Sequence, residues 1–231
     1  MGVDARWSQD ESRHLAGRAR TRDKRVMTRT LPSLVAALAA LLVLSLPKES
    51  LSKDAAARDW TATVKTVHYG IDGGDGLALY RSIGENGPTV GIRRAIARTD
   101  WELLWHRDYV RQGNACRLTG VRPFLTITYT LPRPRAPLDG ALAARWQTFI
   151  DGIVVHEKVH GALIRQLTDD ILAKTAELVV ENDPGCERTR AEVQRRALAA
   201  HARYKDANRR FEASEMAEGG NIHRLILGLV R

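Results

Sequence analysis

Long apolar runs are nearly absent from this 231-residue sequence, in which Leu31–Pro47 is the one long apolar stretch without a charge. Its length suits the apolar part of a secretory signal and falls short of the about 20 residues that a membrane-spanning helix needs. The short basic segment MTRT lies directly before it, which makes Met27 an alternative to Met1 as the true start. Small residues at Ala55–Ala57 offer a site for signal cleavage. The sequence therefore predicts export, and it leaves open whether the segment is cleaved or kept as an anchor.

Residues 1–57 are accordingly predicted to lie outside the fold, as a disordered basic segment followed by a signal peptide or N-terminal anchor. Residues 58–231 are predicted to form a single domain in the periplasm or outside the cell. Any contact with the membrane is expected only through residues 31–47. No cysteine lies directly after the apolar run, so a lipid-anchored lipoprotein is not expected.

Cysteine is also scarce, because the chain contains only Cys116 and Cys186. Neither has a second cysteine nearby, which argues against a metal site built from cysteine pairs. In an exported protein, two lone cysteines most simply form a disulfide. The bond would close a loop of about 70 residues and could stabilise the fold by roughly 4 kcal/mol in the chain-entropy model.

Nucleic-acid-binding signals are missing despite a formal net charge of +9. Residues 1–47 hold 8 basic and 4 acidic residues, so the remainder, with 28 basic and 23 acidic residues, carries only +5. No basic patch interleaved with aromatic residues and no DNA-binding motif accompanies this excess. Nucleic acid is therefore not expected as a partner.

The sequence does contain one strongly periodic stretch, Trp146–Leu172, whose apolar residues fall along one stripe of a helix. His156, Glu157 and His160 lie within it, in the order H-E-x-x-H. Residues four apart project from the same face of a helix, so the two imidazoles can reach one ion. The glutamate beside them is placed to act as general base, as in zinc-dependent hydrolases. The alternative is a pair of satisfied core histidines with Glu157 paired to an arginine.

The remainder of the chain predicts an α+β fold. Strand-like alternation begins near Trp60, two short strands are expected within residues 90–109, and the stretch after Cys116 is the clearest strand of the sequence. A helix is expected from Leu138 to Leu172 or beyond. A second, highly charged helix is expected from about Glu187 to Ala217 and can pack against the first. The prediction is a small antiparallel sheet followed by two long packed helices, the first carrying HEKVH.

Several segments together resemble a bacterial family of predicted secreted zinc-dependent proteases, long described as a domain of unknown function. The resemblance runs from about Trp60 to Gly220. It depends on these features: HYGIDGGDGLALYRSIGENGP, ARTDWELLW, Cys116 ahead of a strand ending in Leu131-Pro132-Arg133, Trp146, the HEKVH helix and Cys186. It implies a zinc site formed by the two histidines and one further ligand.

The third ligand is where this chain departs from the family. Members have a Tyr-Asp segment followed by a His-Gly pair near the end of the second long helix, whereas this chain reads RFEASEMAEGG. A one-residue shift places Glu218-Gly219 over His-Gly, and glutamate is an accepted zinc ligand. Glu218 is therefore the predicted third ligand, with His223 second and Glu212 third.

The sequence thus predicts an exported zinc-dependent metallohydrolase, most simply a peptidase acting on peptides or proteins. His156, His160 and Glu218 are the predicted Zn²⁺ ligands, and Glu157 is the predicted general base. The alternative is a catalytically inactive envelope binding module with a degenerate or structural metal site.

Overall fold

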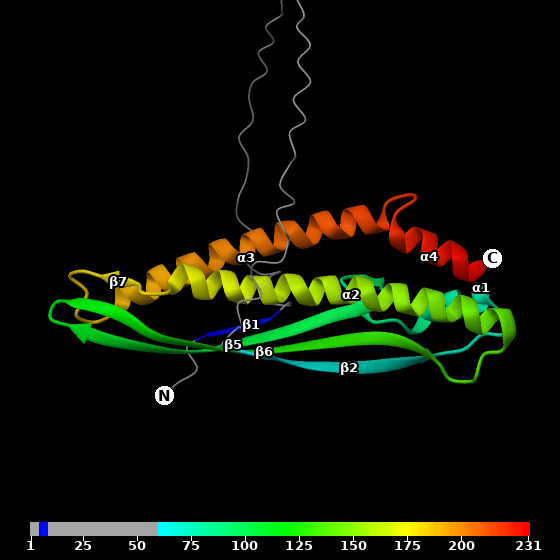
Figure 1. Cartoon of the computed structure of the whole chain (residues 1–231), viewed down its shortest axis with the longest axis horizontal. Helices are drawn as coiled ribbons and strands as arrows, with labels where there is room; N and C mark the ends of the chain where they lie inside the picture. Colours follow the sequence, from blue (N-terminus) through cyan, green and yellow to red (C-terminus); the bar gives the residue numbers. More distant parts are fainter. Residues whose placement is uncertain (1–4, 9–59) are drawn as a thin grey trace, which may run out of the picture.

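The computed structural model describes residues 5–8 and 60–231, which form a long sheet with helices packed along one face (Figure 1). The predicted α+β class is confirmed. The strands of the larger sheet are β1 (Ala5–Ser8), β2 (Ala62–Ile71), β5 (Arg98–Gln112), β6 (Ala115–Pro134) and β7 (Val179–Val180). A separate hairpin is formed by β3 (Thr89–Val90) and β4 (Arg93–Arg94).

The larger sheet has the order β1-β5-β6-β2, with β7 pairing with β6. The hairpin of β5 and β6 forms its centre, with residues paired from Arg98↔Thr130 to Gln112↔Ala115. The predicted antiparallel pattern holds for this pair, but β2 pairs with β6 in parallel. The chain passes from β2 through α1 (Gly76–Asn86) and the small hairpin to β5, which starts at the end of the sheet where β2 finishes and runs in the opposite direction. β6 reverses direction again after β5, so it runs parallel to β2.

Two long helices cover one face of the sheet. α2 (Gly140–Thr175) matches the predicted first helix and α3 (Glu187–Met216) the second. The apolar tail docks as a further helix, α4 (Asn221–Val230), which packs against α2 and α1. Gly152 of α2 permits this contact, since a Cβ there would lie 2.4 Å from Leu225 Cδ1.

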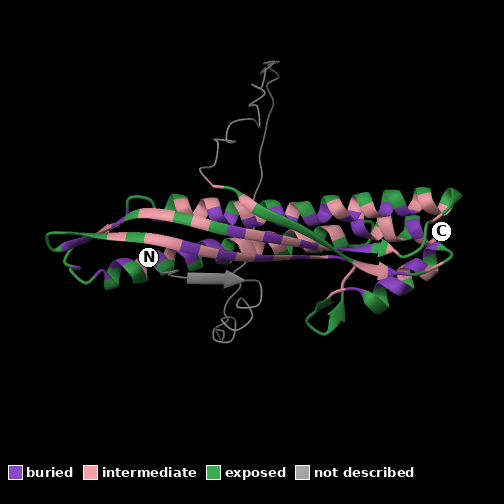
Figure 2. Ribbon diagram, turned by 90° about the horizontal axis from the view of Figure 1, so that it is seen from below, coloured by how far each residue is buried: buried purple, intermediate pink, exposed green. Residues whose placement is uncertain are grey.

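The core lies between the sheet and α2. β5 alternates in the manner of a half-buried strand, with Trp101, Leu103 and Trp105 buried toward the helices. The buried stripe of α2 includes Phe149 and Ile164 and continues along the helix (Figure 2). His156, Glu157 and His160 belong to the same buried stripe, so these polar groups lie inside the seam between elements.

The predicted disulfide is present. Cys116 and Cys186 are joined, with their Cα atoms 5.3 Å apart. The bond fastens the start of β6 to the residue preceding α3. Beside it, the buried carboxylate of Asp183 accepts hydrogen bonds from the Thr189 hydroxyl (2.6 Å) and from the Thr189 (2.8 Å) and Arg188 (3.2 Å) amides. These bonds satisfy amides of the first turn of α3, which have no partner within the helix.

The N-terminal prediction is only partly tested. Leu31–Pro47 lies outside the described residues. Ala5–Ser8, expected to be disordered, instead forms β1 and pairs with Glu102–Trp105 of β5. Backbone pairing to a sheet edge needs no hydrophobic pattern, so no local pattern in residues 5–8 predicts this strand. Within 5–8 and 60–231, none of the helices has an apolar stretch long enough to cross a membrane.

Candidate metal centre

One helical turn of α2 brings the two imidazoles of the H-E-x-x-H motif together. The Nε2 atoms of His156 and His160 lie 3.1 Å apart, and both rings are buried. The helix extends without interruption on both sides of the motif, so the spacing of the two side chains is fixed by regular backbone geometry. The predicted convergence of these two side chains is therefore present.

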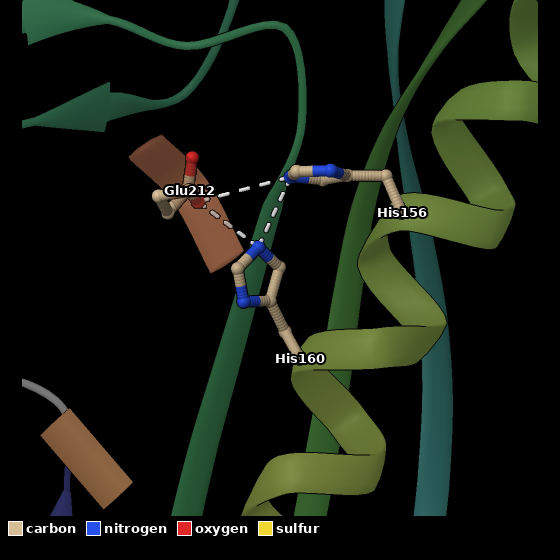
Figure 3. A group of neighbouring side chains, drawn as sticks. All are labelled: His156, His160 and Glu212. Atoms are coloured by element: carbon tan, nitrogen blue, oxygen red, sulfur yellow. Dashed lines mark hydrogen bonds and ion pairs between the residues drawn. The ribbon is translucent and has the colours of Figure 1, made fainter. Parts of the chain in front are cut away.

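A carboxylate from α3 completes the group. Glu212 Oε1 lies 3.0 Å from His160 Nε2 and 3.7 Å from His156 Nε2 (Figure 3). The Glu212 side chain is 43% exposed, so solvent reaches the group from the α3 side. His156, His160 and Glu212 are the one cluster of three potential metal-ligating residues found among the described residues.

Each histidine is held from behind by a second residue of α3. His160 Nδ1 lies 2.7 Å from Asn208 Oδ1, and His156 Nδ1 lies 3.3 Å from Glu215 Oε2. Both partners accept a hydrogen bond from Nδ1, and this orients each ring so that its Nε2 atom faces the other ring and Glu212. Glu215 is itself held by the side-chain amide of Asn221, at 3.1 Å.

Glu157 points to the sheet side of α2. Its carboxylate accepts a short hydrogen bond from the Thr99 hydroxyl of β5, which also lies 3.3 Å from the Glu157 carbonyl oxygen. Thr99 and Glu157 are both buried. The hydrogen bond therefore fixes the orientation of the carboxylate beside the two histidines.

Charge and burial set the protonation of the group. Burial raises the pKa of Glu157, and the hydrogen bond from Thr99 and the neighbouring histidines offset this only in part. Burial alone would lower the pKa of His156, but the hydrogen bond with Glu212 and the nearby carboxylates outweigh it and raise that pKa. Hydrogen bonds with His156 and His160 lower the pKa of Glu212 to about 2. Glu212 is thus an anion at neutral pH, as a ligand for a cation must be.

A glycine lets α2 lie close to the sheet at this point. A Cβ on Gly161 would lie 2.1 Å from the hydroxyl oxygen of Tyr129 on β6. No larger residue fits there without displacing the tyrosine or the helix. Gly161 follows His160 directly, so this contact sets the height of the histidines above the sheet.

Phe211 covers the rings from the α3 side. It stacks on His156 with ring centroids 4.8 Å apart and meets His160 edge-on at 5.2 Å. Aromatic contacts of this kind restrict both imidazoles to one orientation. Phe211 therefore contributes packing, and no polar group, to this side of the cluster.

The third-ligand prediction requires a correction. α3 ends at Met216, and Glu218 is an exposed residue of the turn that follows, outside the cluster. His223 also lies outside the cluster, and its Nδ1 accepts the Gly219 amide at 2.8 Å. Glu212, ranked third from the sequence, is the carboxylate that meets the histidines. The reason is helical periodicity: residues 208, 212 and 215 share the face of α3 that packs on α2.

Sequence reasoning missed Asn208, Glu215 and Thr99. A signal existed for the first two, since they are spaced around Glu212 at intervals of four and three residues along one helix. Thr99 lies in the segment ARTDWELLW, one of the segments on which the family resemblance depends. Its contact with Glu157 joins residues 58 positions apart, which no local pattern indicates.

The donor set fits zinc. Zn²⁺ in proteins is held by imidazole nitrogen and carboxylate oxygen at about 2.0–2.2 Å, so two ligands of a tetrahedral site lie about 3.3–3.6 Å apart. The three potential ligand atoms here are separated by 3.0, 3.1 and 3.7 Å. Three such ligands correspond to a zinc site with one position left for water or substrate.

Comparison with known proteins identifies the family to which the chain belongs. Residues 66–220 match the model of a family described as "Bacterial protein of unknown function (DUF922)". No curated protein and no solved structure matches the chain. The matched region begins within β2 and ends just before α4, so it includes Thr99, the whole of α2 and the Glu212 turn of α3.

Proposed function

We propose that this protein is an exported zinc-dependent hydrolase of peptide bonds. Its chain belongs to the bacterial family of unknown function whose model matches residues 66–220. The observation that carries the proposal is the triangle formed by the two Nε2 atoms and Glu212 Oε1, with Glu157 held beside it. His156, His160 and Glu212 are the proposed zinc ligands. Each histidine also has a hydrogen-bond acceptor behind it, which is the usual arrangement for metal-bound imidazole.

Zinc held by these residues would polarise a substrate carbonyl and make a water molecule acidic enough to react near neutral pH. Glu157 accepts the proton of the attacking water and delivers it to the departing amine. The hydrogen bond from Thr99 keeps one carboxylate oxygen of Glu157 occupied, so the other oxygen handles the proton. A carboxylate is suited to both steps, because it can bind the proton and release it again.

A peptide is the proposed substrate because a glutamate base beside two zinc-binding histidines matches the requirement of amide hydrolysis, in which the leaving nitrogen must be protonated. The alternative is an envelope binding module that holds zinc without turnover. Phe211 is the observation that favours this alternative, since its ring covers both imidazoles from the α3 side.

The test combines metal analysis with proteolysis. The purified full chain is expected to contain one zinc ion per molecule, as measured by inductively coupled plasma mass spectrometry. It is also expected to cleave casein. Glu157→Gln is expected to retain zinc and to lose about 10²- to 10⁴-fold in the cleavage rate, because only proton transfer is removed. Glu212→Gln is expected to lose zinc, since a neutral amide is a poor ligand.

Glu218→Gln is the matched control, six residues further along the chain and exposed in the turn. It is expected to keep both zinc and activity. Unchanged zinc content in Glu212→Gln would refute the proposed ligand set. Zinc binding without any casein cleavage would favour the binding module instead.

A further inference from the structure

An unusual strand forms one edge of the larger sheet. β1 pairs with β5 in antiparallel register, from Ala5↔Trp105 to Ser8↔Glu102. The two strands lie side by side in Figure 1, although about 90 residues of chain separate them. A short hairpin turn forces two strands to pair, whereas a connection of this length does not. The pairing therefore depends on the backbone groups that the edge of β5 offers.

β1 is also separate from the rest of the fold in sequence. It precedes residues 66–220, which match the family, and it precedes the predicted signal segment at Leu31–Pro47. Cleavage of that segment, or a start at Met27, would leave a chain without β1. In such a chain the same four residues of β5 would form the outer edge of the sheet.

This edge leads toward the candidate metal centre. Glu102 lies three residues from Thr99 on β5, and the Thr99 hydroxyl donates to the Glu157 carboxylate. Because the pairing is antiparallel, a strand bound in place of β1 runs with its C-terminal end toward Thr99. Three further residues, at about 3.3 Å each, cover the distance from the partner of Glu102 to the level of Thr99.

We infer that the edge of β5 at Glu102–Trp105 is a binding site for an extended peptide, which adds to the sheet as an antiparallel strand, and that β1 occupies this site in the full chain. Recognition through backbone hydrogen bonds accepts many sequences but requires an extended, unfolded segment. The buried Leu103 and Trp105 of β5 lie on the helix side of the strand, so the site is anchored on the core. The partner is thus an unfolded or denatured peptide rather than a folded protein surface.

One consequence of this binding site, the position at which a bound peptide is cut, rests on the proposed function. A bound peptide would be cut about three residues C-terminal to the residue that pairs with Glu102, where the chain reaches the level of Thr99. Substrates would then need several residues on the N-terminal side of the cleaved bond. The binding itself requires neither zinc nor Glu157.

The experiment measures binding without hydrolysis. The probe is a dye-labelled synthetic peptide, GVDARWSQDE, which copies residues 2–11. It is titrated by fluorescence anisotropy against the full chain carrying Glu157→Gln, and against the same chain with Arg6→Pro and Trp7→Pro. The two prolines remove strand hydrogen bonds of β1 and expose the edge. The proline chain is expected to bind the peptide at least tenfold more tightly, with and without added zinc.

A second measurement does not depend on any protein variant. Peptides with a single N-methyl group at each position of the ARWS segment are titrated against the proline chain. Only alternate residues of a strand point their N–H group at a given neighbour, so binding should be lost at every second position and kept at the others. Equal binding by the two chains, absence of binding, or loss without this alternation would overturn the inference. None of these outcomes depends on zinc content or casein cleavage, which test the proposed function separately.

Discussion

The two ends of the α2–α3 pair are fastened by different kinds of chemistry. At one end the disulfide joins Cys116 to Cys186, and a small apolar cluster of Leu118, Leu178 and Val193 fills the space beside it. At the other end the helices meet through two imidazoles and acidic or amide side chains, and Glu212 is partly open to solvent. The first end needs no ligand to be stable, whereas the second brings together groups that a cation would bind.

The contrast indicates a division of roles. A covalent bond and a dry core set the packing of α3 on α2 before any metal is present. The far end can then hold polar groups at ligand distance, although desolvating them is unfavourable by itself. If this comparison is right, changes at the disulfide end should alter stability and changes at the polar end should alter metal affinity.

The largest effect is expected from removing the disulfide. Cys116→Ala with Cys186→Ala frees a loop of about 70 residues, and the chain-entropy model gives a loss of about 4 kcal/mol in the free energy of unfolding. Urea denaturation measures this loss. Zinc affinity should change by less than about tenfold, because the two ends share no partners. A loss of zinc affinity of about 100-fold or more would show that the ends are coupled.

Gly161→Ala should give the next largest effect. The new Cβ would overlap the Tyr129 hydroxyl, and overpacking of this kind costs about 1–3 kcal/mol. Thermal unfolding and zinc titration of the variant should both show a decrease, since the helix must move at His160. Gly84→Ala in α1 is the matched control, because nothing lies within 4 Å of its Cβ position. It should stabilise the protein by about 0.5–1 kcal/mol.

Asn208→Ala tests the polar end alone. Loss of the acceptor behind His160 should lower zinc affinity about 10- to 100-fold, because the ring is no longer held in one tautomer and orientation. Competition with a zinc-binding dye measures the affinity. Gln194→Ala, at an exposed position of the same helix, should leave it unchanged. An equal effect of both substitutions would mean that helix α3 as a whole, rather than this hydrogen bond, determines affinity.

The smallest effect is expected from Asp183→Asn at the disulfide end. Burial alone would raise the pKa of Asp183, but hydrogen bonds from Thr189 and from backbone amides outweigh it and lower the pKa below its ordinary value. A lowered pKa in the folded state stabilises the protein above the unfolded value and ceases to do so as the pH falls through the folded value. The variant should therefore be less stable at pH 7, and the difference from the parent should shrink below about pH 4. Denaturation at several pH values tests this, and a difference independent of pH would contradict it.

Much of the fold was predictable because its signals are local. The apolar periodicity around Trp146 and in the charged segment after Glu187 predicted α2 and α3 to within a few residues. Because the chain has only two cysteines, the disulfide between them was predictable from the sequence. The strands were harder: residues 90–109 were expected to form two short strands, but they hold the small hairpin and most of the 15-residue β5. Strand ends depend on the length of the partner strand, which lies elsewhere in the chain.

The sequence by itself determined the pairing of His156 with His160 and the position of Glu157, because backbone hydrogen bonds fix residues one turn apart in a helix. Only the tertiary structure decided that Glu212 rather than Glu218 meets them, and that Thr99 holds Glu157. Those contacts depend on how α3 and β5 pack against α2 over separations of more than 50 residues. The register of such packing is set by the whole core, so no short stretch of sequence contains it.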